Sequence, residues 1–187
     1  MIRQFITRRA PVLAAFAMLP ALLPASTLSP RQLEVQKEGV QLVAQVEESA
    51  RSIHYHADHL NSLAGNMQNS RQIHKSHLTQ IRESVNDRLR PALQRLVEIQ
   101  AELPDWKQQS IQDMHIDAAA LAAHVSGAIA EANDSTPTPP AMNREYKNFV
   151  SQVNAQAASL VKTSDAVGEY SSALLKAHDA GVAVPQS

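Results

Sequence analysis

Four of the eight histidines stand in two His-x-x-His pairs, one on each side of a predicted turn. The first pair is His56 and His59, and the second is His74 and His77. Positions 56 and 77 are equally far from the midpoint between the two pairs, and so are positions 59 and 74. A helical hairpin that turns at this midpoint therefore places His56 level with His77 and His59 level with His74. Residues three apart share a helix face, so up to four imidazoles converge when the two faces turn toward each other.

Neutral imidazole is a ligand for zinc, copper and nickel at pH 7, and carboxylates extend that ligand set. Two acidic residues near the end of a later helix are expected at the same end of the molecule. The predicted metal ligands are His56, His59, His74 and His77, with Glu131 and Asp134 as further carboxylate ligands. In the alternative, the helical periodicity puts His59 outside, His56 and His77 on the flanks and only His74 near the core, and no metal binds.

Other chemistry is poorly represented in the chain. The absence of cysteine excludes disulfides, thiolate zinc sites, iron-sulfur clusters and covalent c-type haem attachment. The sequence contains no nucleophile elbow, phosphate-binding glycine loop, dinucleotide fingerprint or His-Glu-x-x-His motif. No glutamate stands three residues before a histidine, which excludes the di-iron bundle motif. We therefore expect a protein that is not an enzyme.

The N-terminus has the pattern of a secretory signal peptide. Arg3, Arg8 and Arg9 precede an apolar run over 10–23, and small residues follow. The run is shorter than the ~20 residues that a membrane-spanning helix needs, so an uncleaved anchor is the less favoured alternative. We expect cleavage after Ala25 and a periplasmic or secreted protein, with no membrane span after cleavage.

Removal of residues 1–25 leaves 17 − 3 = 14 basic and 18 acidic residues, a net charge of −4. A mildly acidic surface does not favour nucleic-acid binding. Glycine is scarce, at 5 residues, and aromatic residues make up 4% of the chain, which favours helices over strands. The composition therefore indicates an all-α protein.

Apolar residues recur at alternating steps of three and four along four segments. The predicted helices span about 30–64, 70–103, 105–133 and 139–179, and 181–187 is a flexible tail. Ser29 with Gln32 is a predicted capping box for the first helix, and Thr138 before Pro139 is a predicted cap for the fourth. Pro91 predicts a kink in the second helix, level with the small residues Ala118 to Ala123 of the third.

Long helices with short connections predict an up-and-down antiparallel four-helix bundle over residues 26–180, with coiled-coil packing along the third helix. Two long hairpins packed as a dimer are the alternative architecture, so the chain is expected to be a monomer or a homodimer. Two functions agree with this fold. One is a non-catalytic binding or interaction module for an unknown protein or envelope partner, and the other is a periplasmic metal-binding or metal-sensing protein that uses the histidines with zinc or copper.

Overall fold

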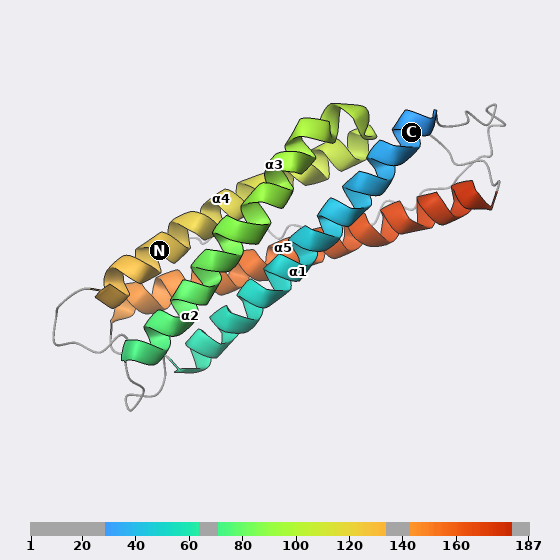
Figure 1. The fold of residues 1–187 in the computed structure, drawn as a ribbon. Coiled ribbons are helices and arrows are strands. Elements are labelled where there is room, and N and C mark those ends of the chain that lie inside the picture. The colour runs from blue at the N-terminus through green and yellow to red at the C-terminus, as the bar shows by residue number, and fades with distance from the viewer. Residues whose placement is uncertain (1–28, 64–70, 134–142, 181–187) are drawn as a thin grey trace, which may run out of the picture.

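The computed structural model describes residues 29–63, 71–133 and 143–180, and within them the chain forms four helical rods and no strand (Figure 1). The first rod is α1 (Pro30–Leu63). The second runs from Arg71 to Glu102 through α2 (Arg71–Glu83), η1 (Ser84–Leu89), α3 (Arg90–Ile99) and η2 (Gln100–Glu102). The third is α4 (Asp105–Asn133), and the fourth is α5 (Arg144–Asp179). The all-α bundle predicted from the sequence is therefore confirmed, while the predicted signal peptide and tail lie outside the described residues.

Rods that follow one another in the chain lie side by side and run in opposite directions. α1 packs against α5 and the second rod, and α4 packs against the same two neighbours (Figure 1). α1 ends and α2 begins at one end of the bundle, where α4 also ends and α5 begins. We call this the histidine end. The opposite end holds the start of α1, η2, the start of α4 and the end of α5, and we call it the lysine end.

Local hydrogen bonds explain where two rods begin. Ser29 Oγ accepts a hydrogen bond from the Gln32 amide at 3.3 Å, and the Ser29 amide donates to Gln32 Oε1 at 2.9 Å, which is a capping box. α5 begins at Arg144, later than the predicted residue 139. Asn143 Oδ1 accepts hydrogen bonds from the amides of Glu145 and Tyr146, so it caps this helix. The predicted cap Thr138 lies outside the described residues.

One continuous apolar core runs the length of the bundle. Every rod contributes side chains with almost no exposure, including Ile53, Leu89, Leu121 and Leu160, each 0% exposed. The apolar stripe along α4 is buried at all positions except Ala118, which is half-buried; its residues are Ile111, Met114, Ala118, Leu121, Val125, Ala128 and Ala132. Tyr170 continues the apolar periodicity of α5 in the sequence, but it is 50% exposed, and its ring packs edge-on against Trp106 with the ring centroids 4.6 Å apart.

A π-helical turn over η1 stands directly before Pro91. The Arg90 amide donates to the Val85 carbonyl, five residues back, instead of to residue 86. Pro91 has no amide hydrogen, and in an α-helix its ring would collide with the Asp87 carbonyl. The wider turn moves that carbonyl away, so the predicted disturbance at Pro91 takes the form of a π turn.

None of the described helices is long and apolar enough to cross a lipid bilayer.

Candidate metal centre

The histidine end brings imidazoles from α1 and α2 face to face. His56 directly precedes the buried Ala57, and His77 directly precedes the buried Leu78. Both rings therefore lie half-buried over the seam between these helices. Their Nδ1 atoms are 3.2 Å apart, and the ring centroids are 5.4 Å apart. Position 56 therefore lies opposite position 77, as the hairpin register requires.

His59 lies one helical turn beyond His56 and is exposed. Its ring centroid is 4.7 Å from that of His77, and it is stacked with the Tyr55 ring at a centroid distance of 6.4 Å and an interplanar angle of 16°. His77 thus contacts two imidazoles of α1. Three of the four predicted ligands form one cluster.

The fourth predicted ligand, His74, turns away from this cluster. It is 0% exposed, and its Nδ1 shares a hydrogen bond with the Tyr146 hydroxyl at 2.8 Å. Its Nε2 is buried with no hydrogen-bond partner among the described residues. Burial lowers the pKa of His74 and raises that of Tyr146, so both side chains are neutral at pH 7.

Electrostatics also favours neutral imidazoles within the cluster. Desolvation lowers the pKa of His56 and His77, and the neighbouring His59 lowers each pKa further by charge repulsion. A neutral imidazole has one nitrogen lone pair free to bind a metal ion or to accept a hydrogen bond. In the neutral pair one Nδ1 donates a hydrogen bond to the other across 3.2 Å, so the lone pair of the donor ring is on its Nε2, and a metal ion bound to both Nδ1 atoms would replace this hydrogen bond.

The predicted carboxylate ligands do not join the rings. Glu131 Oε2 accepts a hydrogen bond from Asn143 Nδ2 at 2.7 Å, which ties the end of α4 to the start of α5. Asp134 lies outside the described residues. Over the described ranges, no three histidine, aspartate or glutamate side chains are already arranged to hold a metal ion. The cluster therefore consists of two facing ring nitrogens, with a third ring beside them.

The lysine end contains a buried base that sequence reasoning missed. Lys107 is 3% exposed, its Nζ donates to Gln36 Oε1 at 2.6 Å, and it lies 5.5 Å from the centre of the Trp106 ring. Burial lowers its pKa to about 8. The signal was present, since Lys107 stands four residues before Ile111 and so extends the apolar stripe of α4.

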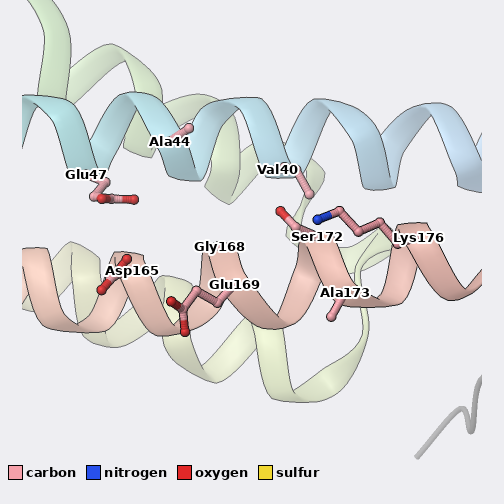
Figure 2. Close-up of a pocket in the computed structure, with 9 residues that line it drawn as sticks. All are labelled: Val40, Ala44, Glu47, Asp165, Gly168, Glu169, Ser172, Ala173 and Lys176. Atoms are coloured by element: carbon pink, nitrogen blue, oxygen red, sulfur yellow. The ribbon is translucent and has the colours of Figure 1, made fainter.

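A groove of about 420 Å³ lies along the surface between α1 and α5, in the half of the bundle nearer the lysine end (Figure 2). The carboxylates of Glu47, Asp165 and Glu169 lie toward one end of it, and Lys176 lies toward the other. Arg51 pairs with Glu47 at 2.7 Å and with Asp165 at 3.8 Å. Because these two carboxylates already have a counter-charge, the groove offers less to a charged ligand than the histidine cluster does.

Comparison of the chain with models of protein families, with curated proteins and with solved structures finds no match.

Proposed function

We propose that this protein is a non-catalytic binding protein whose ligand is a transition-metal ion held by Nδ1 of His56 and Nδ1 of His77. The observation that carries the proposal is the 3.2 Å separation of these two nitrogens across the α1/α2 seam. Two nitrogens bound to one tetrahedral zinc ion at about 2.0–2.1 Å lie about 3.3 Å apart. The two rings therefore need little movement to bind one ion.

His59 is the best third ligand. Its ring is already 4.7 Å from that of His77, and its exposure leaves the side chain free to change rotamer. Water completes the coordination shell at this half-exposed position. A site of two or three imidazoles with no thiolate favours copper(II) over zinc, because nitrogen sites bind divalent ions in the Irving–Williams order.

Calorimetric titration of the purified protein with copper(II) and with zinc tests the proposal. We expect one ion per chain, with a Kd on the micromolar scale or tighter for copper(II) and weaker binding of zinc. The variant His56→Ala/His77→Ala should lose at least tenfold in affinity. Binding should also weaken below pH 6, because protonated imidazole is no ligand.

A matched control removes two histidines elsewhere. His115 and His124 both lie on α4, so His115→Ala/His124→Ala should bind copper(II) as the parent does. Equal loss in both double variants would mean scattered surface binding and would end the proposal. His59→Ala separates a three-ligand site, which it weakens roughly tenfold, from a two-ligand site, which it leaves unchanged.

We also propose that the protein acts outside the cytoplasm, as a periplasmic or secreted protein. The support lies in the three arginines before the apolar run over 10–23 and in the small residues after it. Intact mass spectrometry of protein recovered from the cell envelope should give a chain that begins at Ser26. A chain that begins at Met1 and needs detergent for extraction would support an anchored protein instead.

A further inference from the structure

The histidine cluster lies in an exposed patch that combines imidazoles with apolar side chains. Tyr55 is 66% exposed and Ile73 is 40% exposed. Tyr55 contacts the rings of His56 and His59, and Ile73 stands four residues before His77 and so on the same face of α2. We call Tyr55, His56, His59, Ile73 and His77 together the histidine patch. Apolar and aromatic side chains that form one continuous exposed patch mark surfaces that contact other proteins.

Next to the imidazoles, the faces of α1 and α2 that carry the histidine patch are uncharged. Residues three and four positions apart on a helix are neighbours on the same face. None of the residues at those spacings from His56, His59 or His77 is an aspartate, glutamate, lysine or arginine. Desolvation lowers the pKa of His56 and His77, so both rings are neutral at pH 7. Two copies of this surface can therefore meet without repulsion between like charges.

The metal site proposed above is incomplete within one chain. His56 and His77 present two facing nitrogens, whereas a tetrahedral zinc ion takes four ligands. The His59 and His77 rings, with centroids 4.7 Å apart, are so close that one lies against the face of the other, while an ion lies in the plane of each imidazole that binds it. Neither ring nitrogen of His59 is hydrogen-bonded to a described residue. The exposed His59 is thus free to bind an ion held by another molecule.

We propose that the metal ion joins two copies of this chain, with Nδ1 of His56 and Nδ1 of His77 supplied by one copy and a ring nitrogen of His59 by the other. A two-fold axis through the histidine patch makes the contact reciprocal. Each copy then supplies the third ligand of the other, at one ion per chain. The same contact covers Tyr55 and Ile73 of both copies. This inference rests on the metal site proposed above and adds the source of its third ligand.

The histidine patch is too small to hold two copies together without the ion. A standard stable interface has about 20–30 residues on each side, and this patch is much smaller. Metal–nitrogen bonds from both copies supply the missing free energy of association. We therefore expect a monomer without metal and a dimer with it.

Light scattering after size-exclusion chromatography, with about 100 μM chain and one equivalent of copper(II), tests the bridge. We expect the mass of one chain without metal, twice that mass with copper(II), and a return to one chain when a chelator is added. A protein that binds one copper ion per chain in the calorimetric titration but keeps the mass of one chain would overturn the bridge and leave the metal site. A protein that binds no copper would end both.

A mixing experiment tests His59 as the bridging ligand. His59→Ala keeps the facing nitrogens but lacks the bridging imidazole, and His56→Ala/His77→Ala keeps His59 but lacks the pair. Neither variant by itself should dimerise with copper(II). An equal mixture should form dimers that hold one ion for two chains, because one site of the mixed dimer is complete. If the parent dimerises and the mixture does not, His59 is not the bridging ligand and the proposal is wrong.

One substitution and its matched control locate the contact. Ile73→Lys places an ammonium group of each copy at the contact and should abolish the copper-dependent dimer, while copper(II) still binds as tightly as it does to His59→Ala. Ile116 is 57% exposed on α4 and lies outside the histidine patch, so Ile116→Lys should dimerise as the parent does. Loss of the dimer in both variants would mean general charge repulsion and would exclude this face. A dimer of Ile73→Lys as stable as that of the parent would exclude it as well.

Discussion

The two ends of the bundle each bury a basic side chain, but they stabilise it differently. At the histidine end, His74 is neutral and hydrogen-bonded to the Tyr146 hydroxyl. At the lysine end, Lys107 holds an ammonium group at pH 7 that is supported by Gln36 and the Trp106 ring. Imidazole loses its proton at little cost near neutral pH, whereas an alkylamine does so only at higher pH. Burial therefore leaves a neutral imidazole at one end and a buried charge at the other.

The two ends also differ in the surface contacts that hold α1 against the second rod. At the lysine end, Arg31 pairs with Glu102 and Arg95 pairs with Glu38, and both pairs join α1 to the second rod. The histidine end joins the same two rods through the imidazole contacts of His56 and His77. Exposed ion pairs contribute little and are weakened by salt. A salt series should therefore affect the lysine end more than the histidine end.

The largest expected effect tests whether the two ends unfold together. Leu121 lies midway along α4 and is 0% exposed, so Leu121→Asp buries an unpaired charge in the shared core. We expect a loss of about 4 kcal/mol or more. Fluorescence of Trp106, the one tryptophan of the chain, reports the lysine end, and far-UV circular dichroism reports all four rods. Separate transitions in the two signals would contradict a single cooperative bundle.

Two glycines sharpen the comparison of packing. A Cβ at Gly127, near the histidine end, would lie 2.6 Å from the Phe149 ring, while one at Gly168 would lie 3.8 Å from Val43 at the nearest. Gly127→Ala should therefore destabilise the bundle by about 1–3 kcal/mol through overpacking. Gly168→Ala should stabilise it by up to about 1 kcal/mol, because alanine is the better helix former. Urea denaturation measures the free energy of unfolding of both variants. Changes of the same sign in the two variants would contradict the difference in packing at the two glycines.

A tyrosine at each end provides a smaller test. Tyr146→Phe leaves the buried His74 without its hydrogen bond and should cost about 1–2 kcal/mol. Tyr170 is 50% exposed, so Tyr170→Phe should change the free energy of unfolding by less than about 0.5 kcal/mol. A neutral result for Tyr146→Phe in the same urea series would mean that the hydrogen bond contributes nothing to folding.

The last test concerns pH, and the lowered pKa values of the buried bases give the same sign at both ends. Burial lowers the folded-state pKa of His56, His74 and His77, so the unfolded chain binds more protons and stability rises with pH up to about 6.5. Lys107 has a folded-state pKa of about 8 against 10.5 unfolded, so stability rises again between these values. The raised pKa of Tyr146 acts in the opposite direction above pH 10.

The urea midpoint of the metal-free protein from pH 5 to 10 should therefore show two separate rises. Lys107→Met should remove the upper one and His74→Phe should reduce the lower one. A curve that is flat between pH 8 and 10 in the parent would contradict the buried ammonium.

Periodicity and capping chemistry were enough to predict the rods, since the apolar stripes and the Ser29 capping box depend on short spacings alone. The facing of His56 and His77 also follows from numbering along a hairpin. Partners from distant rods could not be obtained this way. Tyr146 reaches His74 only because the start of α5 lies beside α2, and the Glu131 carboxylate is bonded to Asn143 for the same reason.

The π turn also bears on how the length of this chain can change during evolution. Each α-helical residue turns the chain by about 100°, and the π turn holds one residue more than an α-turn would. Buried positions 81, 85 and 89 accordingly follow two successive steps of four. Deleting the exposed Asn86 would bring Leu89, Leu93 and Leu96 back to alternating heptad steps, whereas a deletion elsewhere in the rod would turn its stripe out of the core. Combined with Pro91→Ala, which removes the need for the wider turn, a one-residue deletion should therefore be tolerated better in this turn than in the α-helical middle of α2 or α3.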